Sequence, residues 1–303
     1  MTIQEAQLLL TQQLSAIYDG REASNIVGWV LEHLTGMTKI DRVVHRDRVL
    51  SATQAELLQR NIDDLLKQRP VQYVLGEAWF AGMRFYVDEN VLIPRPETEE
   101  LVEWVVAEVR EAGGEAGHAA GADGARNQEA GSGLSILDVG TGSGCIPIAL
   151  KKQLSEAIVY GADVSEGALE VAKRNAAALE AGVQFLRVDF LQEAAWPGLP
   201  AIDILVSNPP YIPVRDKATM HNNVLLHEPH LALFVEDDDP LLFYRHIGQF
   251  ALQHMASGGR LYVEIHEELG PATVQLFTSL GLTGIVLRQD LQGKDRMVRA
   301  VKA

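Results

Sequence analysis

The sequence predicts an α/β protein whose larger part is a doubly wound, mostly parallel sheet. Short apolar segments alternate with amphipathic helices through the second half of the chain, which is typical of βαβ units. A glycine-rich turn follows the first of these segments directly, and a short connection suited to a hairpin joins the last two, so the final strand should be antiparallel. Strands are expected at residues 134–139, 157–162, 183–188, 202–206, 259–265, 283–288 and 297–301, and helices between them at 145–150, 166–179, 240–255 and 271–280.

The amino-terminal part of the chain has the pattern of a small helical bundle. Thr2 and Glu5 have the spacing of a capping box at a helix start. Further periodic segments end before Gly36 and before Pro70, as helices do. We therefore expect a helical domain at residues 1–76 and assign it to substrate recognition, although such a domain could also only brace the fold.

The pattern changes after the helical domain. Residues 77–94 place aromatic and β-branched residues around turn signals, which predicts a β-hairpin connector. A catalytic domain is expected over residues 95–303, opened by an amphipathic helix from Pro96 to about Val109. Within it, residues 111–133 are mostly Gly, Ala and small polar residues, which cannot bury enough apolar surface to become ordered. We expect them to form a flexible surface insertion.

A glycine-rich loop follows the strand expected at residues 134–139. Glycines at such a loop take positive φ and let the backbone pass close to a ligand. The dinucleotide fingerprint would need its third glycine where this chain has Cys145, so the spacing favours S-adenosylmethionine over NAD. The expected cofactor-binding residues of the loop are Gly140, Thr141, Gly142, Ser143 and Gly144.

Acidic residues lie at the ends of the neighbouring strands. Asp163 follows the second expected strand, where a carboxylate can accept hydrogen bonds from both ribose hydroxyls. Asp138, just before the loop, would add negative charge near the positive sulfonium of the cofactor. The carboxyl ends of parallel strands carry the ligand in such sheets. One crevice is therefore expected to contain Gly140, Asp163, Asp189 and Asn208.

The tetrapeptide Asn-Pro-Pro-Tyr at residues 208–211 follows another apolar strand. Asn208 Oδ1 and the Pro209 carbonyl could accept the two hydrogens of a planar NH2 group. Pro209 and Pro210 stiffen the backbone without adding an N–H, and Tyr211 could stack on the flat substrate group. Such dipeptides are also common in turns, so the prediction depends on the glycine loop upstream. Together they predict methyl transfer to an amide or ring-amino nitrogen, with Asn208, Pro209 and Tyr211 as catalytic residues.

Composition narrows the class of partner. The chain has 303 residues with 26 Lys and Arg against 41 Asp and Glu, a formal net charge of −15, which disfavours extended contact with a nucleic-acid backbone and favours a protein substrate. The single cysteine, Cys145, excludes an internal disulfide and suits a reducing cytoplasm. No apolar run is long enough to span a bilayer, and the histidines lack the spacing of a zinc site. We expect a cytoplasmic protein that binds no metal.

The chain resembles the HemK/PrmC family of protein-(glutamine-N5) methyltransferases, which modify peptide chain release factors. The resemblance extends over nearly the whole chain, and its most specific part is Asn-Pro-Pro-Tyr in combination with Ile-Pro-Arg-Pro-Glu-Thr-Glu at residues 93–99. One departure is His227, where the family usually has a tyrosine before a Glu-Pro pair. Further matching segments are Gln72-Tyr73, Gly76, and residues 80–82, 138–145, 228–229, 243–245 and 290–296.

This resemblance implies a class I S-adenosylmethionine-dependent methyltransferase fold. The implied substrate is the glutamine of the Gly-Gly-Gln motif in release factors. Asp163 would hold the ribose of the cofactor, Phe190 would lie beside the adenine, and Asp189 would contact it. Asn208 would lie against both cofactor and substrate. The implied substrate-binding residues are Asn208, Pro209, Pro210 and Tyr211.

Three other functions share parts of the pattern. They are N5-glutamine methylation of a ribosomal protein, amino-group methylation of DNA or RNA, and a catalytically silent cofactor-binding module. Association with ribosomes fits a release factor substrate, whereas no direct contact with nucleic acid or with a membrane is expected. The expected mechanism is in-line displacement, in which the glutamine nitrogen attacks the cofactor methyl carbon while Asn208 and Pro209 accept its hydrogens.

Overall fold

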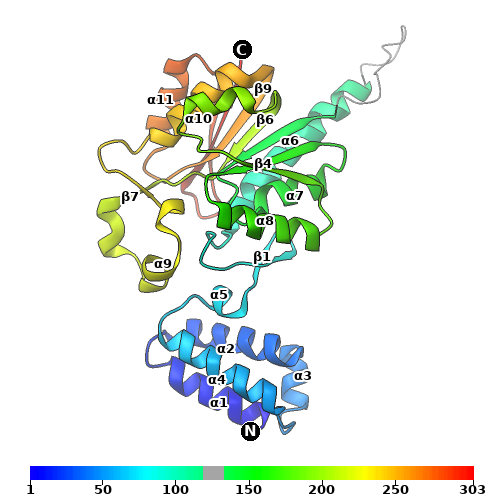
Figure 1. Cartoon of the computed structure of the whole chain (residues 1–303), viewed down its shortest axis with the longest axis vertical. Coiled ribbons are helices and arrows are strands. Elements are labelled where there is room, and N and C mark those ends of the chain that lie inside the picture. Colours follow the sequence, from blue (N-terminus) through cyan, green and yellow to red (C-terminus); the bar gives the residue numbers. More distant parts are fainter. Residues whose placement is uncertain (119–132) are drawn as a thin grey trace. The chain divides into compact units, whose positions relative to one another are not determined.

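The computed structural model of the chain describes residues 1–118 and 133–303 (Figure 1). The chain divides into two compact units. Met1–Glu77 and Met220–Glu228 form the first, and Ala78–Thr219 and Pro229–Ala303 form the second. Among the described residues, no helix is both long and apolar enough to cross a bilayer.

The first unit is helical and has its own apolar core. The capping box predicted at Thr2 is present, with the Glu5 backbone N donating to Thr2 Oγ1 (3.2 Å) and the Thr2 backbone N donating to Glu5 Oε2 (2.8 Å). His227 joins the short helix α9 to this unit, because its Nε2 lies 3.1 Å from the Lys67 carbonyl oxygen. The helices are α1 (Ile3–Leu14), α2 (Gly20–Thr35), α3 (Lys39–Val44), α4 (Ala52–Leu66), α5 (Val71–Leu75) and α9 (Asn222–His227).

The second unit begins with a hairpin of β1 (Ala78–Phe80) and β2 (Met83–Phe85). Phe80 and Phe85 are fully buried and meet edge to face, with ring centroids 6.1 Å apart, so the hairpin belongs to the core of this unit. The next helix, α6, spans Pro96–His118 and is longer than predicted.

The prediction that this helix ends near Val109 is therefore wrong. The part of the predicted insertion at residues 111–118 is helical, because its Glu and Ala residues are good helix formers despite the glycines between them. Residues 119–132 of that insertion lie outside the described residues.

A seven-stranded sheet forms the middle layer of the second unit, in the order β10-β11-β9-β6-β3-β4-β5. All neighbouring pairs are parallel except those of β11, which runs antiparallel to both β9 and β10. The predicted doubly wound fold with an antiparallel last strand is confirmed, although that strand lies between two others and not at an edge. The strands are β3 (Ser135–Val139), β4 (Ile158–Asp163), β5 (Val183–Arg187), β6 (Ile202–Ser207), β9 (Met255–Glu264), β10 (Thr283–Gln289) and β11 (Asp295–Val301).

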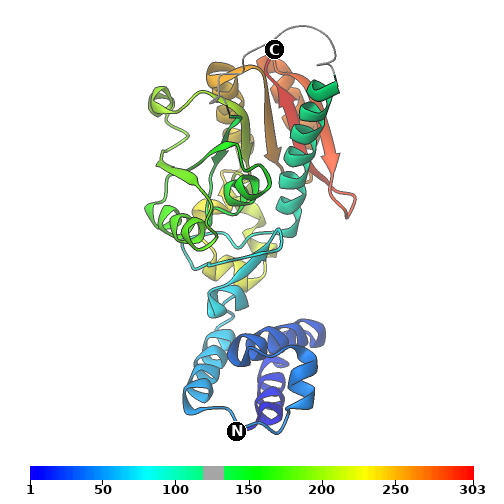
Figure 2. The same cartoon turned by 90° about the vertical axis from the view of Figure 1, so that its right-hand side faces the viewer.

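Helices cover both faces of this sheet. Ile136 packs with the face that carries α6, α7 (Cys145–Gln153) and α8 (Glu166–Ala178), whereas its neighbour Leu137 packs on the other face, with α10 (Leu242–His254) and α11 (Gly270–Leu280). Successive side chains of a strand point to opposite faces, so a strand buried on both sides must be apolar throughout. In Figure 2, α6 runs along the side of the sheet.

Short elements follow the carboxyl ends of β5 and β6. Trp196 lies in the first of these elements. It is buried against Phe190 and Phe250 on the sheet face that carries α10 and α11, with ring centroids 5.6 Å and 5.5 Å away. The indole Nε1 donates to the Phe190 carbonyl (3.0 Å), which fixes the chain just beyond β5. These elements are the 3-10 helices η1 (Glu193–Gly198), η2 (Val214–Thr219) and η3 (His230–Ala232), and the paired strands β7 (Ile212–Pro213) and β8 (Phe234–Val235).

Candidate active site

A cavity of about 320 Å³ lies in the second unit, at the carboxyl ends of β3, β4 and β6. It is lined mainly by apolar side chains, with a few polar groups and glycine backbone among them, as is usual for a small-molecule site. Eight of the residues predicted from the sequence line it: Gly140, Gly142, Asp163, Asp189, Phe190, Asn208, Pro209 and Pro210.

The glycine loop passes along the cavity because its backbone is folded back onto β4. The backbone N–H groups of Gly140 and Thr141 both donate to the Ala162 carbonyl (2.9 and 3.0 Å). Gly140 and Gly142 have φ of 74° and 51°, which favours glycine, and a Cβ built on either would meet no atom within 4 Å. The loop therefore presents bare backbone to the open space of the cavity.

The other loop residues are turned into the protein. The Thr141 and Ser143 side chains are buried. Gly144 has φ of 79° and precedes α7, where a Cβ would approach the Ala172 Cβ to 3.1 Å. Thr141, Ser143 and Gly144 therefore determine the shape of the loop by packing against the protein interior.

Asp163 ends β4 beside the loop and is held by two backbone donors. Its Oδ2 accepts from Gly142 N (2.9 Å) and its Oδ1 accepts from Ser165 N (2.9 Å). Burial raises the pKa of this carboxyl, and the two N–H donors oppose that effect. Each oxygen keeps a further lone pair, so the carboxylate can still accept from hydroxyl groups of a bound ligand.

Asp189 and Phe190 extend the site beyond β5. Asp189 is exposed and caps its own turn, since its Oδ1 accepts from Leu191 N (3.1 Å). Phe190 is buried, with its ring 4.9 Å from that of Phe250, and it contributes an apolar wall to the cavity. An apolar wall beside a carboxylate suits a flat heterocycle joined to a sugar.

Asp138 and Cys145 are buried behind the loop. Burial raises the pKa of Asp138 to about 7, outweighing the opposite effect of the Thr141 hydroxyl. The negative charge expected from the sequence is therefore only partly present near neutral pH. Burial also raises the pKa of the Cys145 thiol to about 12, and Cys145 packs in the apolar core.

Asn208 follows β6, whose last residue, Ser207, pairs in register with Val139 at the end of β3. The Ser207 hydroxyl donates to the Val139 carbonyl (2.7 Å), so the strands that carry Asn208 and the glycine loop are joined where they end. Asn208 Nδ2 donates to Thr98 Oγ1 (3.1 Å). This contact leaves Oδ1 as the acceptor that Asn208 can offer to a ligand.

Thr98 and Glu264 are site residues that the sequence reasoning missed. The Thr98 hydroxyl donates to Glu264 Oε2 (2.7 Å), and the Tyr211 hydroxyl donates to Glu264 Oε1 (3.0 Å). Tyr211, predicted to stack on the substrate, is thus tied by its hydroxyl to the end of β9. Two features of the sequence could have indicated these residues. Thr98 lies in the segment at residues 93–99 that resembles the family, and Glu264 is an acidic residue at the end of an apolar strand.

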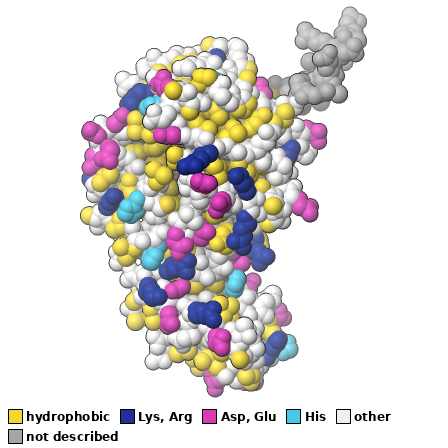
Figure 3. Space-filling model, viewed as in Figure 1, with side chains coloured by type: hydrophobic (Ala, Val, Ile, Leu, Met, Phe, Trp, Pro, Cys, Tyr) yellow, Lys and Arg dark blue, Asp and Glu magenta, His cyan; other side chains and the backbone are white. Residues whose placement is uncertain are grey.

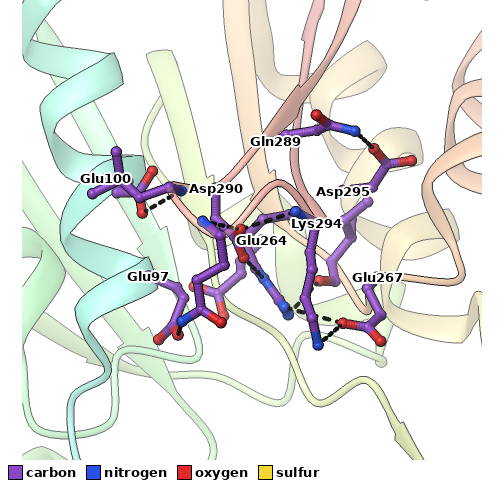
Figure 4. Close-up of polar contacts among 12 residues, drawn as sticks. Glu97, Glu100, Glu264, Glu267, Gln289, Asp290, Lys294 and Asp295 are labelled. Carbon is purple, nitrogen blue, oxygen red and sulfur yellow. Dashed lines mark hydrogen bonds and ion pairs between the residues drawn. The ribbon is translucent and has the colours of Figure 1, made fainter.

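The turn between β10 and β11 braces this end of the sheet (Figure 4). Arg296 Nε donates to Asp290 Oδ2 (3.1 Å) and Arg296 Nη1 donates to the Ile265 carbonyl (3.3 Å), which places a cation beside Glu264. The turn also reaches α6, because Leu291 N donates to Glu100 Oε1 (3.2 Å). The segment at residues 290–296 therefore holds α6 and β9 together.

The residues present fit S-adenosylmethionine. The cavity offers open space beside the backbone of Gly140 and Gly142, and a carboxylate at Asp163 with free lone pairs for ribose hydroxyls. Phe190 provides an apolar surface for adenine.

The chain matches two family models and many proteins of known name. The Methyltransferase small domain matches residues 127–233 and the PrmC N-terminal domain matches residues 5–76. A release factor glutamine methyltransferase of Flavobacterium psychrophilum is 40% identical over 301 residues, 99% of this chain and 99% of that protein. Proteins of the same name are 38% identical in Bacteroides thetaiotaomicron (96% of this chain, 97% of that protein) and 35% identical in Streptococcus pneumoniae (97% and 96%).

These matches cover almost the full length of this chain and of each relative, so they include the helical unit as well as the sheet. The methyltransferase domain spans the glycine loop, Asp163 and Asn208. The protein is therefore a methyltransferase that uses S-adenosylmethionine. The chain belongs to the release factor glutamine methyltransferase family.

Proposed function

We propose that this protein transfers a methyl group from S-adenosylmethionine to the side-chain amide nitrogen of the glutamine in the Gly-Gly-Gln motif of peptide chain release factors. One observation carries the proposal: a single cavity is lined both by the glycine loop with Asp163 and by Asn208, Pro209 and Pro210. Cofactor and amide can therefore bind side by side.

At the cofactor end, this chain's residues bind and orient. Asp163 would accept hydrogen bonds from the ribose hydroxyls, Phe190 would cover the adenine, and the loop backbone at Gly140 and Gly142 would line the remainder. When bound, S-adenosylmethionine supplies a methyl group attached to a positively charged sulfur. Asp189, exposed at the rim, is proposed to contact the adenine.

At the reacting end, Asn208 and Pro209 would orient the substrate amide. An amide nitrogen is a poor nucleophile because its lone pair is delocalised into the carbonyl. Asn208 Oδ1 and the Pro209 carbonyl would accept its two hydrogens, which fixes the plane of the amide and increases electron density on nitrogen. These hydrogen bonds strengthen as positive charge develops on nitrogen, so they favour the transition state over the ground state.

A release factor as substrate is supported by the names of the relatives, which cover nearly all of this chain. The helical part at residues 1–76, most of which matches the PrmC N-terminal domain, is proposed to recognise the release factor. The net charge of −15 also favours a protein over a nucleic acid. Figure 3 shows Lys and Arg side chains interspersed with Asp and Glu on the face in view, a mixed pattern in keeping with that preference.

The substitution Asn208→Ala tests the proposal. We expect it to lower methylation of a release factor by about 100-fold or more, as removal of one preorganised hydrogen-bonding group at a developing charge does. The affinity for S-adenosylmethionine, measured by calorimetry, should change by only a few fold. Gln275→Ala, at an exposed amide on α11, is the matched control and should behave as wild type. Undiminished turnover in Asn208→Ala would refute the assignment of this residue.

A further inference from the structure

The amide of Asn208 is the end of a chain of side-chain hydrogen bonds. Asn208 Nδ2 donates to Thr98 Oγ1 (3.1 Å), and Thr98 donates to Glu264 Oε2 (2.7 Å). The second oxygen of Glu264 accepts from the Tyr211 hydroxyl (3.0 Å). The four groups come from α6, from the segment after β6 and from the end of β9, so the fold must be complete before they meet.

The direction of each hydrogen bond follows from Glu264. An ionised carboxylate can only accept, so the Thr98 hydroxyl must give its single hydrogen to Glu264. Thr98 Oγ1 then has only lone pairs left for Asn208, which must turn its NH2 group toward Thr98. Oδ1 is thereby left as the group that faces a ligand. The opposite rotamer would place an NH2 group against the NH2 of the substrate, with no acceptor between them.

Burial keeps water away from this chain of bonds. Thr98 is 2% exposed and Glu264 is 1% exposed, so water does not compete for either. Burial raises the pKa of Glu264, whereas the hydrogen bonds from Thr98 and Tyr211 and the charge of Arg296 favour the ionised form. Arg296 is itself held by Asp290.

We propose that Thr98 and Glu264 are positioning residues, which fix the amide orientation of Asn208 so that its oxygen faces the substrate NH2. The proposal rests on the function proposed above. If Thr98 and Glu264 had only a structural role, they would need only to fill the space around them and to leave no buried polar group without a hydrogen bond. The positioning role needs a donor–acceptor order that ends at Asn208, and this requirement can be tested separately.

The test compares Thr98→Val, which keeps the shape but removes the hydroxyl, with Thr98→Ser, which keeps the hydroxyl. Each purified variant is assayed with S-adenosylmethionine and an unmodified release factor. We expect Thr98→Val to lower kcat by about tenfold or more, the effect of about 1.4 kcal/mol in the transition state. The KM for the release factor and the Kd for the cofactor should change little, and Thr98→Ser should recover most of the activity.

A second variant, Glu264→Gln, changes which groups donate and which accept along this chain of hydrogen bonds. A glutamine can present its NH2 group to Thr98, which would then give its hydrogen to Asn208 and reverse the amide. We expect a loss of kcat at least as large as in Thr98→Val, with cofactor affinity retained. If Thr98→Val does not fold, Glu264→Gln carries the comparison.

Three results would overturn the proposal. The first is a wild-type kcat in both Thr98→Val and Glu264→Gln, and the second is an equal loss of kcat in Thr98→Val and Thr98→Ser. The third is failure of both Thr98→Val and Glu264→Gln to fold. The first two would leave wild-type methylation of the release factor intact, so the proposed function would stand. Absence of methylation by the wild type would refute the proposed function and, with it, the positioning role.

Discussion

The substitution Asp138→Asn should make the protein less sensitive to alkaline pH. Asp138 is fully buried at the end of β3, and burial raises its pKa from 3.8 to about 7. Because the folded-state pKa lies above the unfolded value, folding favours the protonated carboxyl. The stability that the protonated Asp138 contributes is complete below about pH 4 and is lost progressively as the pH rises from there through about 7.

The magnitude follows from the size of this change. A pKa that rises from 3.8 to about 7 costs the ionised form about 4 kcal/mol of unfolding free energy by pH 8, since one unit corresponds to about 1.4 kcal/mol. More than half of this loss, about 2.5 kcal/mol, falls between pH 5 and pH 8. Asparagine has nearly the same shape but carries no charge at either pH, so it escapes the loss.

Equilibrium unfolding in urea at pH 5 and pH 8 measures the effect. The free energy of unfolding of Asp138→Asn relative to wild type should rise by about 2.5 kcal/mol between the two pH values. Glu170→Gln, which removes an exposed carboxylate on α8, is the control and should not show this rise. A difference between Asp138→Asn and wild type that stays constant across the two pH values would refute the reasoning.

Two further predictions concern the cofactor loop. Asp163→Ala should raise the Kd for S-adenosylmethionine by about tenfold or more, because it removes the proposed ribose acceptor and the contact that holds Gly142; calorimetry measures this, and an unchanged Kd would contradict it. Cys145, buried and with its pKa raised to about 12, should react with iodoacetamide at pH 8 only after unfolding, as read by mass spectrometry; rapid labelling of the native protein would show that α7 opens.

The sheet could be predicted because its strands carry local signals. Apolar segments bounded by turns identify the strands, and the short connection after residue 288 indicates that the last strand is antiparallel. The insertion of β11 between β9 and β10 has no such signal, since strand order depends on packing between distant segments. The length of α6 was underestimated because the glycines after residue 112 outweighed the helix-forming residues among them.

The candidate site divides in the same way. The glycine loop, Asp163 and Asn208 each follow an apolar strand, so their convergence at one edge follows from the parallel arrangement. Thr98 and Glu264 are 166 residues apart, and no periodicity relates them. Their contact arises only when α6 packs beside β9, which the sequence pattern of either element alone cannot indicate.

The proposed reaction is transfer of the methyl group to one glutamine amide of a release factor. The most direct measurement incubates the purified protein with S-adenosylmethionine and an unmodified release factor, and maps the product by tandem mass spectrometry of the Gly-Gly-Gln peptide. We expect a single added methyl group on that glutamine, absent when Asn208→Ala replaces the wild type. An unmodified peptide, in the presence of a wild-type protein that binds the cofactor, would contradict the account.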